Sequence, residues 1–351
     1  MTKSIKRVDR ASSTMSRSHF IGTTAAAAAA FAMLPGCRRT VSTGGGRSNF
    51  RGVQIGTISY SFRSMPGSAE EILGYLVDAG LSSVELMSNP IEAFAGAPEV
   101  PRMPRGAFPG RRPGGAPGGR QAPELSEEEI AELQAAREVA VEELRKWRLS
   151  PPMERFEALR KMYNDEGVTI HLAKFSPANW SDEDIDYAFN AARALGAYGV
   201  TNEISNEAAM RLGPFAEKHG MFAVFHNHGQ PAEPGFTFDA PLSFNPNVAL
   251  NYDAGHAFGF TGEHPNITIE RLHDRIKSIH LKDKTAPDSD PGNTNMPWGQ
   301  GETPIADILR LIQREKWPIN CDIELEYQIP EDSDAVAEVR KCVEYCRDIL
   351  T

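Results

Sequence analysis

Apolar and polar positions follow two distinct patterns from residue 52 onward. Short runs of mostly apolar residues are typical of buried strands, whereas apolar positions three or four apart are typical of amphipathic helices. The pattern predicts strands at residues 53–60, 82–87, 168–175, 198–204, 221–228, 248–253, 276–283 and 318–327. It predicts helices at residues 68–80, 152–167, 181–196, 207–220, 239–245, 265–275, 303–317 and 332–350.

Successive strand–helix units with strands that are apolar almost throughout imply parallel strands buried on both faces. A closed (β/α)₈ barrel over residues 52–351, the TIM-barrel fold, fits the number of units and the length of the segment. The alternative is an open doubly wound sheet. Such a sheet usually carries a glycine-rich phosphate turn after its first strand, and the segment TISYSFRSMPGS at residues 57–68 is not such a turn.

Residues 91–151 form an insertion between the second predicted strand and the second predicted helix. Its first part is rich in proline, glycine and arginine, and this composition cannot build a packed core. Residues 124–147 are charged and helical, with Ser126 and Glu129 placed to form a capping box. The insertion either covers the barrel mouth, pairs with another subunit or extends into solvent.

Residues 1–36 have the composition of an export signal, with a basic start and an apolar run at residues 21–34. The segment LPGC at 34–37 resembles the lipobox of bacterial lipoproteins, in which the cysteine is acylated. SRSHFI at 16–21 resembles a twin-arginine signal, with Ser18 in place of the second arginine. A disordered alanine-rich tail is the alternative. We predict a periplasmic protein, anchored to the membrane through Cys37, with residues 37–51 as a flexible linker.

The chain of 351 residues has a formal net charge of −10 and no run of basic residues in its body. This balance disfavours nucleic acid and anionic membrane surfaces as partners, so membrane contact is expected only through the N-terminal anchor. Cys321, Cys342 and Cys346 remain after residue 37, and this odd number does not indicate a disulfide framework. A homo-oligomer is compatible with the sequence.

Carboxylates, imidazoles and a lysine gather at the predicted strand ends, which meet at one face of a barrel. Converging carboxylates raise one another's pKa, and a divalent cation resolves that conflict. Mixed histidine, aspartate and glutamate ligands suit one ion of Mn²⁺, Zn²⁺, Co²⁺ or Mg²⁺. These residues are Glu85, His171, Lys174, Glu203, His226, His228, Asp253, His256, His280, Asp283, Glu324 and Glu326.

Three of these strand ends resemble a known superfamily. The segments NYDAGHAFGF at 251–260, SIHLKD at 278–283 and DIELEY at 322–327 are similar to those of xylose-isomerase-like barrels, and in particular of sugar phosphate isomerases and epimerases. That superfamily also includes inosose dehydratases and zinc apurinic endonucleases. The resemblance implies that Asp253, His280 and Glu324 bind the metal ion and that His256 contacts the substrate.

The fourth metal ligand is left open by a difference from the family pattern. Sugar epimerases commonly carry E-N-H at the end of the fifth strand, where the glutamate binds the metal. Here residues 226–228 read HNH, with His226 in the place of that glutamate. Either His226 or Glu203 on the neighbouring strand completes the site, or both bind. His228 then corresponds to an acid/base histidine.

The resemblance implies a metal-dependent isomerase or epimerase acting on a small sugar or keto sugar. Such an enzyme abstracts a proton next to a carbonyl through a metal-bound enediolate. The candidate acids and bases are Glu324, His228 and Glu203, and the candidate substrate contacts are His256, Lys174, His171 and Glu326.

The nearest alternative is a lyase or dehydratase on a keto sugar, because the same enediolate can expel a leaving group. A non-catalytic sugar-binding lipoprotein is a further alternative. An abasic-site endonuclease fits less well, because the chain is acidic and the second strand ends in Glu85 rather than a histidine.

Overall fold

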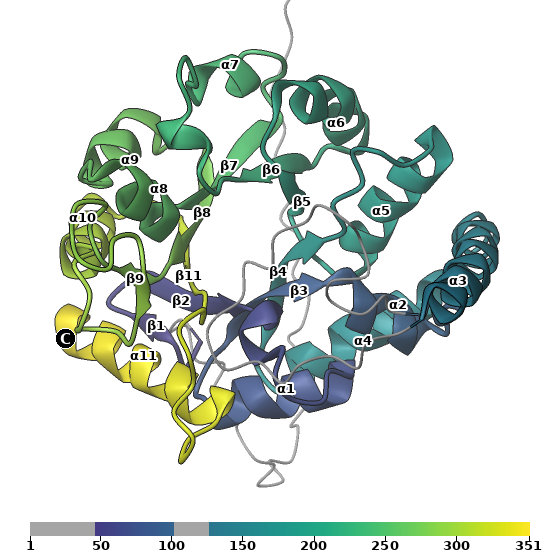
Figure 1. Cartoon of the computed structure of the whole chain (residues 1–351), viewed down its shortest axis with the longest axis horizontal. Coiled ribbons are helices and arrows are strands. Elements are labelled where there is room, and N and C mark those ends of the chain that lie inside the picture. The colour runs from purple at the N-terminus through teal and green to yellow at the C-terminus, as the bar shows by residue number, and fades with distance from the viewer. Residues whose placement is uncertain (1–45, 102–125) are drawn as a thin grey trace, which may run out of the picture. The chain divides into compact units, whose positions relative to one another are not determined.

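Eight parallel strands form a closed ring in the computed structural model, which describes residues 46–101 and 126–351 (Figure 1). The strands are β2 (Val53–Ile58), β3 (Ser83–Met87), β4 (Thr169–Lys174), β5 (Gly199–Glu203), β6 (Phe222–His226), β7 (Val248–Asp253), β8 (Ile276–Leu281) and β11 (Asn320–Ile323). Their order is β2-β11-β8-β7-β6-β5-β4-β3, and β2 pairs with β3 to close the ring. The predicted TIM barrel is confirmed.

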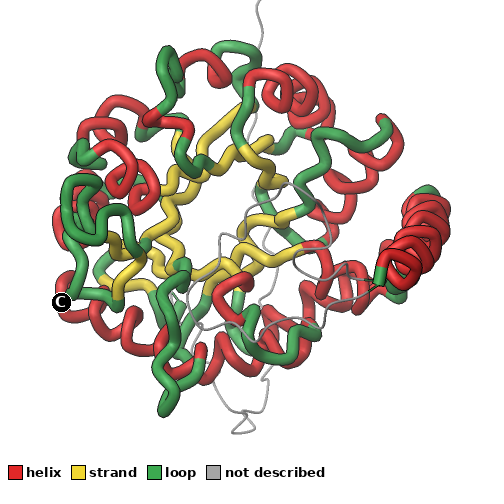
Figure 2. The backbone as a smooth tube through the Cα atoms, in the orientation of Figure 1, coloured by secondary structure: helices red, strands yellow, loops and turns green. Residues whose placement is uncertain are grey.

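Helices surround this ring, as Figure 2 shows with strands in yellow and helices in red. They are α1 (Ala69–Asp78), α2 (Ser88–Ala95), α3 (Glu127–Arg148), α4 (Met153–Asp165), α5 (Asp182–Ala194), α6 (Asn206–His219), α7 (Asp239–Leu242), α8 (Ala254–Thr261), α9 (Asn266–Leu272), α10 (Ile305–Glu315) and α11 (Ala335–Leu350). In α10, apolar residues three or four apart are buried, such as Ile305, Ile308 and Ile312. This stripe is what holds a helix against the strands.

The number of register pairs differs from one pair of neighbouring strands to the next. Two neighbouring pairs of strands, β2–β3 and β4–β5, share only two register pairs each. The other neighbours in the ring share four or five. The unit of β3 and β4 is therefore bounded on both sides by short ladders, and the chain between these two strands contains the insertion.

The structure differs from the predicted elements after β3 and after β7. Residues 254–261 lie between the predicted strand at 248–253 and the predicted helix at 265–275, and they form a helix of their own, α8. The reason is a side-chain cap: Asp253 Oδ1 accepts a hydrogen bond from the backbone N–H of His256 at 2.7 Å. Helix α2 occupies residues 88–95, so its second half falls within the expected insertion. The barrel sheet also gains a short antiparallel strand, β1 (Asn49–Phe50), and a separate two-stranded antiparallel sheet forms from β9 (Asp283–Lys284) and β10 (Asn295–Met296).

The helical part of the insertion is α3. It begins with the predicted capping box of Ser126 and Glu129, and none of its residues is buried. Its C-terminal end is attached to the barrel. The Arg148 guanidinium donates to both carboxylate oxygens of Glu92 at 2.8 and 3.1 Å and lies 3.8 Å from the Trp180 ring centre. Figure 1 shows α3 outside the ring of helices.

The predicted signal and Cys37 lie outside the described residues, as do most of the linker and the proline-rich residues 102–125. Among the helices that the structure describes, none is both long and apolar enough to cross a membrane. Cys321, Cys342 and Cys346 are buried and free, so no disulfide joins the described parts of the chain.

Candidate active site

Side chains from four neighbouring strands meet at the C-terminal mouth of the barrel. They are His226 from β6, Asp253 from β7, His280 from β8 and Glu324 directly after β11. One nitrogen or oxygen atom of each lies within 4.8 Å of the others, and all four side chains are buried. The strand register brings them together, since Asp253 is paired with His280 in the parallel ladder. We call these four residues the mixed cluster.

His280 lies between two carboxylates. Its Nδ1 is 2.7 Å from Glu324 Oε2, and its Nε2 is 2.8 Å from Glu85 Oε2. Burial alone would lower the pKa of His280, but these two carboxylates outweigh burial and raise that pKa well above its ordinary value. Glu85 is fixed in turn by Thr201 at 2.6 Å and Asn251 at 2.8 Å. Glu85 therefore orients the His280 ring, as carboxylates do behind metal-binding histidines.

A buried lysine lies among the carboxylates. Lys282 is 1% exposed. Its Nζ is 2.8 Å from Asp253 Oδ2, 3.0 Å from Glu324 Oε2 and 2.8 Å from Glu326 Oε2. Burial alone would lower the pKa of Lys282, but the three carboxylates outweigh burial and raise it. Sequence reasoning missed this residue. The signal was its position two residues after His280, because alternate residues of a strand share a face.

This network of buried charges is not balanced. The carboxylates of Glu85, Asp253, Glu324 and Glu326 face two cations, Lys282 and the His280 imidazolium. Buried charge without a partner is costly. A divalent ion held by His280 would replace the second proton of that ring and so add one net positive charge to the network, and two imidazoles with two carboxylates are ligands that Mn²⁺, Co²⁺ and Zn²⁺ accept.

His226 also fits a metal ligand. Its Nδ1 is buried without a hydrogen-bond partner among the described residues. Burial lowers the pKa of His226 well below its ordinary value, and the neighbouring His280 cation lowers it further. The ring is therefore neutral near pH 7, in the form that binds metal. The residues present in the mixed cluster thus fit a divalent ion.

Glu203 lies outside the mixed cluster, at the half-exposed rim. Its carboxylate accepts a hydrogen bond from Lys174 Nζ at 2.7 Å and lies 3.1 Å from His228 Nδ1. Burial alone would raise the pKa of Glu203, but His228 and Lys174 outweigh burial and lower it to about 2. The same contact raises the pKa of His228. Of the two expected fourth ligands, the structure groups His226 with the other three and joins Glu203 to Lys174 and His228.

Two expected substrate contacts lie at the mouth. His256 is in the first turn of α8, where its Nδ1 lies 2.9 Å from Asp253 Oδ2 and 3.1 Å from Lys282 Nζ. Its Nε2 lies 3.6 Å from Glu326 Oε2. Glu326 is therefore adjacent to both His256 and Lys282, at the edge of the mixed cluster.

His171 lies deeper in the barrel than expected. Its Nε2 is 2.9 Å from Asp322 Oδ2 and its Nδ1 is 2.9 Å from the Ser83 hydroxyl. Ser278 donates to the same Asp322 oxygen. The reason is that His171 lies in the middle of β4 and not at its end. The structure thus joins His171 to Asp322, whose carboxylate in turn lies within 4.8 Å of ligand atoms of Glu85 and His280.

Asp283 binds backbone N–H groups of the loop after β8 and, among the described residues, makes no hydrogen bond to a ligand atom of the mixed cluster. Its carboxylate accepts hydrogen bonds from the backbone N–H groups of Gly299 at 2.8 Å, Gly301 at 2.9 Å and Thr303 at 3.2 Å. A Cβ at Gly301 would lie 2.6 Å from Asp283 Cγ, which requires glycine there. Asp283 therefore folds the loop after β8 against the barrel.

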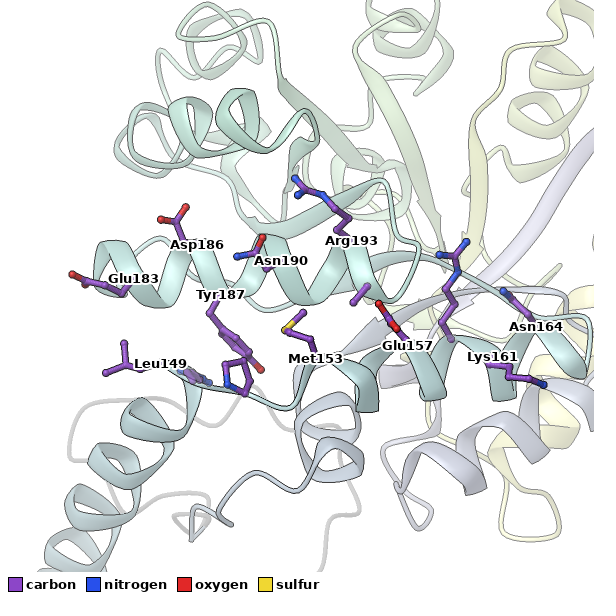
Figure 3. Close-up of a pocket in the computed structure, with 14 residues that line it drawn as sticks. Leu149, Met153, Glu157, Lys161, Asn164, Glu183, Asp186, Tyr187, Asn190 and Arg193 are labelled. Carbon is purple, nitrogen blue, oxygen red and sulfur yellow. The ribbon is translucent and has the colours of Figure 1, made fainter.

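A separate groove of about 990 Å³ lies between α4 and α5 (Figure 3). Its lining includes Met153 and Glu157 from α4, and Tyr187, Asn190 and Arg193 from α5. None of the mouth residues lines this groove, which lies between two outer helices. The chemistry of the strand ends is therefore at the mouth and not in the groove.

Known proteins share this fold. A family model described as the xylose isomerase-like TIM barrel matches residues 202–346. The chain is 36% identical over 76 residues to the inosose dehydratase of Clostridium beijerinckii. That match covers 21% of this chain and 25% of that protein, so the chain matches a quarter of the relative's length.

Solved structures of other proteins superpose on most of this chain. A sugar phosphate isomerase/epimerase from Parabacteroides distasonis superposes with a TM-score of 0.52 and 16% identity, over 86% of this chain and 96% of that one. The probable 3-DHS dehydratase AsbF from Bacillus anthracis superposes with a TM-score of 0.53 and 12% identity, over 83% and 98%. At these identities the structures show the fold alone. The expected resemblance to xylose isomerase-like barrels is confirmed.

Proposed function

We propose that this xylose isomerase-like TIM barrel is an isomerase or epimerase that moves a proton next to the carbonyl of a sugar or keto sugar, with one divalent metal ion as cofactor. The observation that carries the proposal is the convergence of His226, Asp253, His280 and Glu324 at the barrel mouth. Groups able to donate and accept a proton lie beside them. A barrel mouth is also where TIM-barrel enzymes carry out their chemistry.

The mixed cluster would hold the ion, which could be Mn²⁺, Zn²⁺, Co²⁺ or Mg²⁺. When bound, the ion would supply the electrophile that polarises the carbonyl oxygen of the substrate. The protein's part is to keep the four ligands in place. Glu85 does so for His280, and Lys282 does so for Asp253 and Glu324.

His228 and Glu203 are the pair that supports proton donation. The His228 side chain is 49% exposed, and its Nδ1 lies 3.1 Å from Glu203 Oε2. The ionised Glu203 fixes the ring and favours the imidazolium, because it raises the pKa of His228. The Nε2–H of that imidazolium can then donate to a sugar oxygen or carbon.

Glu324 is the candidate base. Burial alone would raise its pKa, but the Lys282 and His280 cations outweigh burial and keep that pKa well below its ordinary value. Glu324 is therefore ionised and able to accept a proton. Lys174, His256 and Glu326 offer hydrogen-bonding groups for sugar hydroxyls around the same mouth.

Dehydration of a keto sugar is the second candidate, and the 36% identity to an inosose dehydratase over 76 residues favours it. Both reactions begin with abstraction of the same proton. In dehydration, the His228 imidazolium would protonate a departing hydroxyl and not a carbon.

Incubation with a panel of keto sugars in D₂O tests the proposal. We expect deuterium at the carbon next to the carbonyl in a product with an intact skeleton, detected by NMR. Glu324→Gln should reduce exchange by at least 100-fold, since a general base contributes roughly 10²- to 10⁴-fold. An unsaturated product would support the dehydratase instead. Sugar binding without exchange in any substrate would contradict both.

A further inference from the structure

Helix α3 has one long side that is exposed along its whole length. Residues three or four apart share a side of a helix, and this side carries Glu128, Glu132, Ala135, Val139 and Lys146. All five are exposed, and Val139 is 61% exposed. We call these five residues the outer face. It is acidic at the N-terminal end, apolar in the middle and basic at the C-terminal end.

The C-terminal end of α3 is fixed beside the groove between α4 and α5. The Trp147 ring centre lies 6.3 Å from that of Phe156 in α4 and 6.0 Å from that of Tyr187 in α5. Leu149, directly after α3, lines the groove and is 53% exposed. Figure 3 shows Leu149 at one end of the groove, so the groove begins where α3 ends.

The charges that line the groove change sign along its length. Glu183 is in the first turn of α5 and Glu157 is in the first half of α4. Arg193 is near the end of α5 and Arg160 is in the second half of α4. Arg148, at the acidic end, is already paired with a carboxylate of α2. Within residues 46–101 and 126–351, no carboxylate lies within 4.0 Å of the guanidinium of Arg160 or Arg193, so both can pair with another chain.

We propose that two copies of this chain form a two-fold dimer in which the outer face of α3 of each copy docks in the groove of the other. Because α3 ends where the groove begins, a two-fold axis near Leu149 brings the basic end of the outer face to the acidic end of the groove. The acidic end of the outer face then meets Arg160 and Arg193. This surface goes beyond the proposed function, which needs only the barrel mouth.

The spacing of the charges supports the same arrangement. At 1.5 Å per residue, Glu132 and Lys146 are about 21 Å apart along α3, and Glu183 and Arg193 are about 15 Å apart along α5. Long arginine and lysine side chains span the difference. The docked α3 would run antiparallel to α4 and α5, which is also the favourable orientation for the helix dipoles.

Sedimentation velocity over a range of protein concentrations tests the proposal. The parent chain is the full chain with Cys37→Ser, which cannot take a lipid anchor, so that association does not reflect a shared membrane or micelle. We expect a monomer–dimer equilibrium in which the dimer weakens as the salt concentration rises, because salt screens contacts between exposed charges.

Charge reversal identifies the two surfaces. Glu128→Arg/Glu132→Arg on α3 and Arg160→Glu in the groove should each weaken dimerisation at least about 10-fold, because each places like charges together. All three substitutions in one chain should restore the dimer, since the contacts again pair opposite charges. Restoration also shows that the separate variants were folded. Glu70→Arg/Glu344→Arg, on exposed positions of α1 and α11, is the matched control and should dimerise like the parent chain.

Three results would each overturn the proposal. They are a parent chain that stays monomeric at every soluble concentration, a dimer that Arg160→Glu leaves unchanged, and a combined variant that stays monomeric. A dimer that the Glu70→Arg/Glu344→Arg control weakens as much as Glu128→Arg/Glu132→Arg does would also count against it, because the effect would then follow net charge and not these surfaces.

Discussion

Lys282 is a fixed cation inside an acidic mouth. Its ammonium contacts Asp253, Glu324 and Glu326 at 3.0 Å or less, while the side chain is almost completely buried. The carboxylates would otherwise repel one another across a short distance. Lys282 therefore keeps the mouth assembled whether or not an ion is bound, and this role differs from that of a ligand or a proton donor.

Replacing Lys282 by methionine should destabilise the fold by about 3–5 kcal/mol, because it leaves buried carboxylates without their cation. Added Mn²⁺ should restore more stability to this variant than to the wild type. Urea unfolding with chelator and with Mn²⁺ measures both effects. Lys161→Met is the control, because Lys161 is 75% exposed and its salt-bridge partner among the described residues is Asp165 on the same helix. Equal stability of the two variants would contradict this role.

At the residue scale, the strand-end positions of Asp253, His280 and Glu324 follow from the alternation of strands and helices in the sequence. The partners of these residues do not. Glu85 and His280 are 195 positions apart in the chain, and their hydrogen bond depends on the barrel closing between β2 and β3. Periodicity describes neighbours along one strand, so it could not predict contacts across the barrel.

The Asp253 side chain both caps helix α8 and takes part in the contacts at the barrel mouth. Asp253 caps the helix through one oxygen, and its other oxygen contacts Lys282 and His256. The glycines in this helix allow close packing, since a Cβ at Gly255 would lie 2.6 Å from the Lys282 carbonyl oxygen. The sequence pattern predicts no helix at these residues, and Gly255 and Gly259 disfavour a helix on propensity alone.

Gly255→Ala should destabilise the protein by about 1–3 kcal/mol, because the added methyl group overpacks the contact with Lys282. Gly74→Ala is the matched control. Gly74 lies in α1 with nothing within 4 Å of an added Cβ, so alanine there should stabilise the protein by about 0.5–1 kcal/mol. Thermal and urea unfolding compare the two. The same sign for both variants would show that the packing around Gly255 is looser than described.

Helices α5 and α6 are joined by a charge contact that depends on pH. Asp186 accepts hydrogen bonds from Lys218 at 2.6 Å and from His219 at 2.7 Å. Burial alone would raise the pKa of Asp186, but these two partners outweigh burial and lower it. A carboxylate with a lowered pKa stabilises the fold above its unfolded pKa of about 3.9, and this contribution is lost as the pH falls towards the folded pKa.

Asp186→Asn should therefore reduce the free energy of unfolding more at pH 7 than at pH 3. Urea unfolding of both proteins across this range measures the difference. Asp165→Asn removes an exposed pair on one helix and should change stability by no more than about 0.5 kcal/mol at either pH. A difference for Asp186→Asn that grows as the pH falls would contradict the lowered pKa.

For the whole molecule, we propose that the barrel is exported and held at a membrane through Cys37. The proposal rests on the basic start, the apolar run and the LPGC segment of residues 1–37. Full-length protein expressed in a bacterium that processes lipoproteins should partition into the detergent phase of Triton X-114. Cys37→Ser should remain in the aqueous phase. A wild-type protein found only in the aqueous phase would contradict lipid attachment.

The number of paired residues differs between the strand edges of the barrel, and this difference affects where the barrel opens locally. The two-strand unit of β3 and β4 is joined to the rest of the ring by short ladders on both sides. Backbone amides on these two edges have the fewest hydrogen bonds to break, so transient opening starts there and not evenly around the ring. Glu85 lies on β3 and holds His280 on the far arc of the barrel. Each such opening would loosen His280, so the exchange of an ion held by this histidine would depend on local unfolding at two strand edges that are remote from it in sequence.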